Sequence, residues 1–315
     1  MGAGAIGGVV AARLHESGAD VVLIARGRHA EVIAHDGLTL IEPARETTVR
    51  VPVVTRLADA AVTPTDRVVL AVKSQDTAAV LGALGSAPRA TPIACFQNGV
   101  VNERTVGAVF PETYGVVVMM PAAHLEPGRV EAYAAPIPGL FDIGRADGGV
   151  DDVAREMAAA LTAAGFDGRA VPDVLRWKHT KLLMNLGNAV EAMCGLDDAA
   201  IELVGRARRE GVACFAAAGI DYASNAEERE RRGDLLQVRE IAGKPRGGGS
   251  SWQSLARGLG TIEADALNGE VARIGARAGV PTPVNTLLRD RAIAAAAARV
   301  PPGSISATEL LAELR

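Results

Sequence analysis

The sequence has 315 residues, of which 49% are hydrophobic and 3% aromatic, and its formal net charge is −4. This length suits two domains better than one. The balanced charge and scarce aromatic residues argue against a nucleic-acid partner, and no apolar run is long enough to span a membrane. The three cysteines lie far apart and the five histidines show no ligand spacing, so we expect reduced thiols in a cytoplasmic protein and no metal site.

Strands alternate with helices in the first half of the sequence. The helices are expected at 5–17, 28–35, 75–84, 102–109 and 151–164, and the strands at 20–25, 68–72, 91–96, 115–119 and 166–171. Residues 38–41 and 49–54 are expected to form a surface hairpin, and 128–144 further antiparallel strands. This alternation predicts an α/β domain with a parallel, doubly wound Rossmann-type sheet.

From Pro172 onward the strand pattern stops. Helices are expected at 173–193, 198–218, 225–240, 251–257, 261–278, 284–299 and 306–314, with a glycine-rich loop over 244–251. The sequence therefore predicts a sheet domain over residues 1–171 and an all-helical domain over residues 172–315.

A glycine-rich motif opens the chain. Residues 2–7 read Gly-Ala-Gly-Ala-Ile-Gly, and a predicted helix, a β-branched strand and Arg26 follow. Gly2 permits a tight turn, Gly4 lets the backbone approach a pyrophosphate, and Gly7 lets the helix lie close to the sheet. The first helical residues, Ala5 and Ile6, would then face the phosphates of a dinucleotide with their backbone amides.

The residue that ends the second predicted strand indicates which dinucleotide binds. An acidic residue there reads the ribose 2′-hydroxyl of NAD, whereas this chain has Arg26, with Arg28 close by. A cation suits a 2′-phosphate, so we expect NADPH. The alternative is that both are ordinary surface residues in an arginine-rich protein, in which only four of the 33 Lys and Arg residues are lysines.

The glycine motif lacks the strand that should precede it. Met1 directly precedes Gly2, although the first strand of a Rossmann sheet is central and its absence would leave its neighbours without ladder partners. We hypothesise that the start codon is misassigned and that the natural chain begins upstream. The alternative is a truncated protein of low stability.

Five segments together resemble the ketopantoate reductase (2-dehydropantoate 2-reductase) family. They are the opening GAGAIGG, Val72–Gln75 (VKSQ), Gln97–Gly99 (QNG), Trp177–Asn188 (WKHTKLLMNLGN) and Thr261–Gly269 (TIEADALNG). The resemblance implies a Rossmann domain followed by a helical domain, and a role in pantothenate biosynthesis. It also implies that NADPH supplies hydride, that a lysine is the general acid, and that a glutamate and asparagines bind the substrate.

The predicted helix around Lys181 carries a polar stripe. At about 100° per residue, one face holds Trp177, Lys178, Lys181, Asn185 and Asn188, and the rest of the helix is largely apolar. Such a stripe is typical of a helix that lines a cleft, here between the two domains, because a solvated face would carry Glu, Asp and Arg. Lys181 is our candidate general acid, since an ammonium stabilises charge that develops on a carbonyl oxygen and then donates a proton. Lys178 is the alternative.

The other candidate residues come largely from the resemblance. Glu263, which shares a face of the expected 261–278 helix with apolar residues, becomes a catalytic ligand for a substrate hydroxyl or for the lysine; alternatively it is a first-turn acid. Ser251 matches a substrate-binding serine and Asn185 matches a substrate-binding asparagine. Asn188 lies one residue before the place of a second asparagine and is expected to substitute for it. Lys73 and Asn98 follow predicted strands, so we expect them near the nicotinamide and ribose, with Asn98 also reaching the substrate and Glu263 also contacting the cofactor. Asn98–Gly99 is alternatively a plain turn.

The chain departs from the family pattern at a few positions. Ala189 stands where many members have a second asparagine, and Ser254 and Leu255 replace a Gln-Asp pair. The reaction is therefore a firmer expectation than 2-dehydropantoate as the small 2-keto acid. A related reductase of another 2-keto acid, or a non-catalytic NADP-binding protein, are the alternatives. A homodimer through the helical domain is a further hypothesis.

Overall fold

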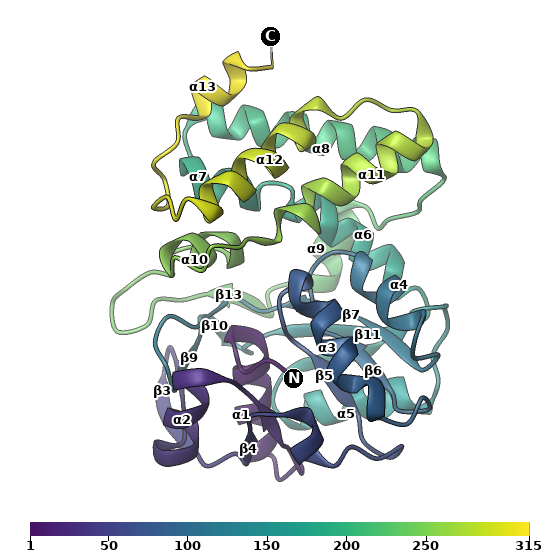
Figure 1. Ribbon diagram of the computed structural model, residues 1–315, viewed down its shortest axis with the longest axis vertical. Coiled ribbons are helices and arrows are strands. Elements are labelled where there is room, and N and C mark those ends of the chain that lie inside the picture. Colours follow the sequence, from purple (N-terminus) through teal and green to yellow (C-terminus); the bar gives the residue numbers. More distant parts are fainter. Residues whose placement is uncertain (315) are drawn as a thin grey trace. The chain divides into compact units, whose positions relative to one another are not determined.

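The computed structural model describes residues 1–314, apart from the side chain of Ser86, and the chain folds into two compact units (Figure 1). Unit 1 contains Met1–Gln97, Asn102–Leu175 and Asn225–Arg246. Unit 2 contains Asn98–Val101, Arg176–Ser224 and the chain from Gly247 onward. The mixed α/β first domain and the helical second domain expected from the sequence are confirmed.

Unit 1 holds the strands. A five-stranded sheet runs in the order β12 (Asp167–Ala170), β11 (Leu140–Arg145), β7 (Thr113–Met119), β6 (Ile93–Cys95) and β5 (Val68–Leu70). Its pairs are parallel except for β7 with β11. A four-stranded sheet has the order β3 (Arg45–Val49), β2 (Leu38–Glu42), β9 (Arg129–Ala132) and β8 (Ala122–Ala123). Two short parallel strands, β1 (Leu23–Ile24) and β4 (Val53–Val54), form a separate ribbon.

The helices of unit 1 cover these sheets. They are α1 (Ala5–Glu16), α2 (Gly27–Asp36), η1 (Leu57–Ala60), η2 (Ser74–Asp76), α3 (Thr77–Ala83), η3 (Leu84–Ser86), α4 (Val101–Gly107) and α5 (Asp152–Ala163). Helix α5 packs against β11 and β12, and α1 packs against β2, β8, β9 and α5. Helix α1 therefore lies in the interior of the unit, which explains its apolar sequence.

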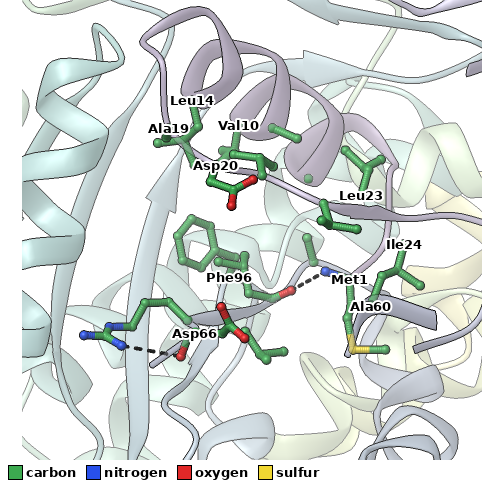
Figure 2. A pocket seen from close by; sticks show the side chains of 18 of the residues that line it. Met1, Val10, Leu14, Ala19, Asp20, Leu23, Ile24, Ala60, Asp66 and Phe96 are labelled. Carbon is green, nitrogen blue, oxygen red and sulfur yellow. Dashed lines mark hydrogen bonds between the residues drawn. The ribbon is translucent and has the colours of Figure 1, made fainter. Parts of the chain in front are cut away.

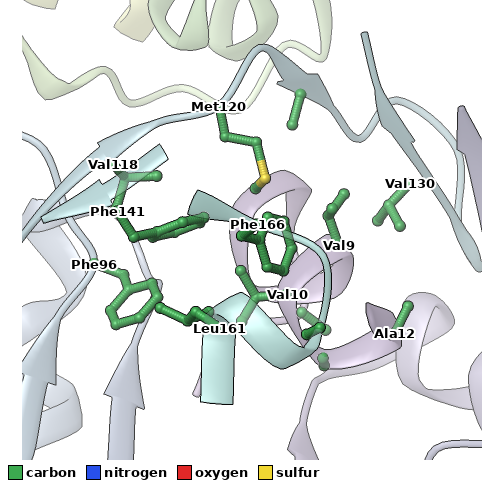
Figure 3. Packing of buried hydrophobic residues seen from close by; sticks show 14 of the residues in the cluster. Val9, Val10, Ala12, Phe96, Val118, Met120, Val130, Phe141, Leu161 and Phe166 are labelled. Atoms are coloured by element: carbon green, nitrogen blue, oxygen red, sulfur yellow. The ribbon is translucent and has the colours of Figure 1, made fainter. Parts of the chain in front are cut away.

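Aromatic and branched side chains fill the core of unit 1. Figure 3 shows Phe141 between Phe96 and Phe166, with ring centroids 5.5 and 5.0 Å away. Val9 and Val10 of α1, both almost fully buried, reach the same cluster. Because this core joins α1 to the five-stranded sheet, it fixes the position of the glycine motif that begins the helix.

Met1 lies where the first strand of a Rossmann sheet would run. Its amino group donates to Val69 O (2.6 Å), its carbonyl accepts from Ala71 N (2.9 Å), and the next residue, Gly2, donates to Ile24 O (3.1 Å). These bonds connect β5 on one side and β1 on the other. β1 pairs with β4 and β5 pairs with β6, and β1 is a strand over only two of the six residues expected.

A cavity of about 530 Å³ lies beside Met1, lined by residues of β1, β5, α1 and α5. Figure 2 shows Val10 and Leu14 of α1 and Phe96 around it. Burial lowers the pKa of the Met1 ammonium to about 5. Burial at this position therefore disfavours the charged form of the amino group.

Residues 225–246 return from the helical half of the sequence to unit 1. They form α9 (Asn225–Arg232) and β13 (Leu236–Val238), which pairs with β10 (Ala134–Pro136). Arg231 of α9 donates to Asp142 Oδ1 (2.7 Å) and to Asp167 (3.2 Å). The expected single helix over 225–240 was wrong, because Gly233 has a φ of +49° and ends α9.

Unit 2 is helical. Its elements are α6 (Val174–Asn185), which begins in unit 1, α7 (Asn188–Cys194), α8 (Asp198–Ala218), α10 (Ser250–Ala256), η4 (Glu263–Asp265), α11 (Asn268–Ala278), α12 (Pro283–Ala297) and α13 (Ala307–Ala312). Helix α11 packs against α8 and α12, and α10 packs against α7. A continuous apolar cluster from these helices forms the core.

Further sequence-based boundaries need correction. The hairpin is made by β2 and β3, not by 38–41 with 49–54, since β4 pairs with β1 instead. The helix expected over 261–278 begins only at Asn268, because Leu267 has non-helical dihedral angles. The expected domains, 1–171 and 172–315, differ from the two compact units, in which the chain leaves unit 1 after Leu175 and returns to it at Asn225.

Candidate functional site

The glycine turn is tightly packed at two of its three glycines. Gly2 has a φ of +92°, and a Cβ there would lie 2.9 Å from the Ala71 carbonyl. A Cβ on Gly7 would lie 1.9 Å from Gly2 O. No side chain can be accommodated at either position without moving the backbone, so both glycines are required by the fold itself.

Gly4 is different, because its surroundings are open. It is the extended N-cap of α1, and the nearest atom to a Cβ there would be His124 Nδ1 at 4.0 Å. Helix α1 has no acidic residue in its first turn and no side-chain cap. The amides of its first residues, Ala5 and Ile6, therefore face an open approach, as a pyrophosphate would require. The residues present fit the phosphates of a dinucleotide.

His29 of α2 supports the glycine turn through a hydrogen bond to its backbone. Its Nδ1 accepts from the backbone N–H of Gly128 (2.8 Å), so its Nε2 carries the proton and donates to Ala3 O (2.7 Å). Its ring lies 4.2 Å from that of His124. Sequence analysis gave His29 no role, because nothing local in the sequence connects it to a carbonyl 26 residues earlier.

A second cavity, of about 410 Å³, lies at the carboxyl ends of β1 and β4, beside Gly2 and Ala3. Arg26, the extended N-cap of α2, lines it. Arg28 is not among the lining residues, is largely exposed, and pairs with Glu31 at 3.2 Å. The structure thus places Arg26, rather than Arg28, at the candidate nucleotide cavity.

Lys73 lies three residues after the end of β5 and is the N-cap residue of η2. A chain of hydrogen bonds connects its loop to the loop after β6: Gln97 donates to Thr77 Oγ1 (2.8 Å), and Thr77 donates to Asn102 (2.8 Å). Asn102 in turn donates to Ser74 Oγ (3.1 Å). These buried partners, which sequence analysis did not identify, fix the strand-end loop from which Lys73 projects.

Lys181 and Asn185 lie one turn apart on α6. Lys181 is half-buried, and Asn185 is 9% exposed. Side chains four residues apart on a helix are neighbours. The Asn185 Nδ2 has no hydrogen-bond partner among the described residues. Buried amides are normally satisfied, so this donor points to a ligand. Lys178, the alternative acid, is on the same helix and is 3% exposed.

Asn188 does not continue the helix of Lys181, which corrects the single helix expected over 173–193. Helix α6 ends at Asn185, and Asn188 begins α7. The carbonyl of Leu186 accepts from the Asn268 side chain (3.1 Å). Gly187 lets α8 approach closely, since a Cβ there would lie 3.1 Å from Val204. Asn188 is therefore near the end of α6 but not on its polar stripe.

Glu263 lies in the short turn η4, and it is 5% exposed. The sequence predicted that Glu263 shares a helix with Ile274, but Ile274 lies on α11 and Glu263 does not. The Asn98–Gly99 turn belongs to the same unit and packs close by, since a Cβ on Gly99 would lie 2.9 Å from Ala266 O. Unit 2 thus brings the loop of Asn98 next to the turn that follows Glu263.

Ser251 lies in the first turn of α10 and is 2% exposed. The backbone N–H of Gly249, which caps this helix, donates to Glu191 of α7 (3.1 Å). Ser254 and Leu255, where the sequence departs from the family pattern, are also buried in α10. Most of α10 is therefore buried, and only its last residue, Ala256, is exposed.

The predicted site residues fall into two sets. Gly2, Gly4, Ala5, Ile6, Gly7, Arg26 and Lys73 lie in unit 1, and Asn98, Lys181, Asn185, Asn188, Ser251 and Glu263 lie in unit 2. That the two sets meet across a cleft stays a prediction. Within residues 1–314, no cluster of three or more His, Cys, Asp or Glu side chains could hold a metal ion, and none of the helices described there is long and apolar enough to cross a membrane.

Comparison with known families covers both units. The family described as "Ketopantoate reductase PanE/ApbA" matches residues 1–148, and its C-terminal counterpart matches residues 173–294. The chain belongs to the ketopantoate reductase family. This membership makes it an oxidoreductase of the class that acts on CH–OH groups.

Curated relatives of this family member align over nearly their whole length. The 2-dehydropantoate 2-reductase of Pyrococcus horikoshii is 27% identical over 298 residues, covering 91% of this chain and 93% of the relative. That of Halobacterium salinarum is 29% identical over 301 residues, covering 92% and 95%.

Solved structures show the same fold. A PanE/ApbA family ketopantoate reductase from Ralstonia eutropha superposes with a TM-score of 0.78 at 26% identity, covering 95% of this chain and 98% of that one. A D-mandelate dehydrogenase solved with NADH and anilino(oxo)acetate gives a TM-score of 0.78 at 21% identity, covering 95% and 97%. The second likeness shows the fold alone.

Proposed function

We propose that this ketopantoate reductase family member reduces a small 2-keto acid to the 2-hydroxy acid with NADPH, and that 2-dehydropantoate is the first substrate to test. The observation that carries the proposal is that half-buried Lys181 and the unsatisfied amide of Asn185 lie one turn apart on α6. A proton donor and a hydrogen-bond donor one turn apart suit a carbonyl substrate whose oxygen gains negative charge.

NADPH would be held by unit 1. The amides of Ala5 and Ile6, beside the open Gly4, would bind the pyrophosphate, and Arg26 would bind the 2′-phosphate. When bound, the cofactor supplies hydride to the substrate carbonyl carbon. His29 holds the turn in place through Ala3 O, and Lys73, from the loop after β5, would contact the ribose and nicotinamide.

Lys181 is the proposed general acid. Its Nζ would stabilise the charge on the substrate carbonyl oxygen and then donate a proton to it. Asn185 would donate its free Nδ2–H to the substrate carbonyl or carboxylate. Asn98, Asn188 and Ser251 would hold the remaining polar groups, and Glu263 would accept from a substrate hydroxyl or orient the lysine while also contacting the cofactor.

The experiment follows NADPH absorbance with 2-dehydropantoate and a panel of small 2-keto acids. Lys181→Ala should lower kcat by about 10²–10⁴-fold, the usual contribution of a general acid, with the Kd of NADPH unchanged. Lys244→Ala is the matched control, because this exposed lysine lies outside both sets of site residues. Retained turnover in Lys181→Ala would move the acid role to Lys178.

The panel separates the alternatives. Turnover of another 2-keto acid but not of 2-dehydropantoate would change the proposed substrate and keep the proposed reaction. The departures from the family pattern at Ala189, Ser254 and Leu255 are a reason to test for this outcome. Tight NADPH binding without oxidation by any keto acid would indicate a non-catalytic binding protein. A homodimer through unit 2 is a further proposal, which light scattering would test.

A further inference from the structure

Two arginines lie side by side at the end of the β1–β4 ribbon. The strands pair in parallel, with Ile24 opposite Val54, and the backbone bond from Ala25 N to Val54 O (3.1 Å) continues the ladder. Two residues further along each strand come Arg26 and Arg56. Neighbouring strands lie about 4.8 Å apart and residues two apart share a face, so these two side chains leave the same face of adjacent strands.

The two positions have the same local structure. Arg26 (φ −135°, ψ 158°) is the N-cap of α2, and Arg56 (φ −129°, ψ 141°) is the N-cap of η1. Both are exposed, and neither guanidinium has a hydrogen-bond or ion-pair partner within residues 1–314. Two like charges in register repel each other unless an anion lies between them.

The cavity of about 410 Å³ is where such an anion would bind. Arg26 and Arg56 both line it, together with Thr55 and His29, and no acidic side chain does. Its remaining wall is apolar and comes largely from Val72, Ala79, Val80 and Ala83. The volume is within the range of small-ligand sites, and the wall suits a flat base beside the two cations.

We infer that Arg56 forms a two-arginine clamp with Arg26 on the 2′-phosphate of NADPH, and that Arg56 is thus a second residue that selects NADPH over NADH. This inference rests on the proposed use of NADPH. A phosphate monoester carries nearly two negative charges at neutral pH and offers three oxygens, enough for forked hydrogen bonds from both guanidinium groups. The base would lie against the apolar wall. Arg28 is outside the clamp, since it pairs with Glu31.

The test is equilibrium binding, measured by calorimetry, of NADPH, NADH, 2′,5′-ADP and 5′-ADP. Arg56→Gln should raise the Kd of NADPH and 2′,5′-ADP about tenfold or more, the usual loss for a hydrogen bond to a charged group, and leave NADH and 5′-ADP within about twofold. Arg26→Gln with Arg56→Gln should bring the Kd values of NADPH and NADH close together. Arg50→Gln is the matched control, because Arg50 is exposed beyond the opposite end of β4 and donates to His35 O.

The outcomes are distinct. If Arg56→Gln raised the Kd values of NADPH and NADH by the same factor, or changed neither, the clamp would be overturned. A wild-type chain that binds 2′,5′-ADP no better than 5′-ADP would overturn the choice of NADPH and the clamp with it. A chain that discriminates as expected but reduces no 2-keto acid would overturn the proposed function and leave the clamp intact. Because both arginines are exposed, the unfolding temperatures of the variants should match that of the wild type.

Discussion

The side-chain amide of Asn185 has opposite effects on stability and on substrate binding. Its Nδ2 is buried without a partner among the described residues, an arrangement that destabilises a folded protein by about 1–3 kcal/mol. The same amide is a donor already positioned for a substrate oxygen. Function and folding therefore make different demands on this one side chain, as is usual for binding sites.

Asn185→Leu separates these demands. We expect kcat/KM for the keto acid to fall about 10–100-fold, because the substrate loses a hydrogen bond in a buried site, while the unfolding temperature stays equal or rises. The matched control is Asn268→Leu, since Asn268 is also buried but donates to Leu186 O and to Asn285. That control should lower the unfolding temperature. A fall in stability for Asn185→Leu would contradict our view of its amide.

Local signals in the sequence were sufficient for the glycine turn but not for its support. Gly2, Gly4 and Gly7 follow one another within six residues, and their spacing alone indicates the turn. His29 acts on Ala3 through a backbone carbonyl, and any residue type could supply that carbonyl. The break at Gly187 was missed for a similar reason, because the apolar pattern runs through it and only the contact with Val204 reveals why the glycine is needed.

At the scale of elements, the short ribbon β1–β4 and the five-stranded sheet are joined through Met1. The burial of its ammonium, whose pKa falls from 8.0 to about 5, has a consequence for stability. Below pH 8 the unfolded chain takes up a proton that the folded chain does not. The free energy of unfolding should therefore fall as the pH drops from 8 to 5, by roughly 3 kcal/mol from this group.

Acetylation of the amino group tests this prediction. An acetylated chain keeps the N–H that donates to Val69 O and cannot take up the proton, so its stability should lose this component of the pH dependence. Urea unfolding of both forms at pH 5, 6, 7 and 8, with Met1 verified by mass spectrometry, measures the difference. The same pH dependence in both forms would show that the amine is solvated in the native state.

Most elements were predictable because their signals are local. The strands β5, β6 and β7 are largely apolar or β-branched runs between turn residues, and the sequence located each to within a few residues. β13 was missed because its three residues follow a highly charged helix and become a strand only by pairing with β10. η4 was missed because the apolar spacing of α11 extends back through Leu267, whose backbone is not helical.

At the scale of the whole molecule, the ion pair of Arg231 with Asp142 holds residues 225–246 in unit 1. Both side chains are at least 90% buried, and burial raises the pKa of Asp142 despite its partner. Arg231→Ala would leave a buried carboxylate without its main partner, which typically costs about 3–5 kcal/mol. We expect the amide of Arg239, which donates to Tyr133 O, to lose its protection from hydrogen exchange.

Arg232→Ala is the control for this prediction. Arg232 lies beside Arg231 on α9 but pairs with Glu228 four residues earlier on the same helix, an arrangement that contributes little. Its removal should change the exchange of Arg239 hardly at all. If Arg231→Ala also left this exchange unchanged, the ion pair would not be what retains the segment, and the β10–β13 ladder alone would do so.

The interleaving of the two units could not be predicted, because it depends on contacts between distant residues such as Arg231 and Asp142. It also constrains how such a protein can diversify. A recombination event at Pro172 that exchanged the second half of the gene would import a foreign version of residues 225–246. In the new protein, β10 and the Asp142 carboxylate of the first half would meet a segment that lacks the matching strand and arginine. The two halves are therefore expected to be inherited together.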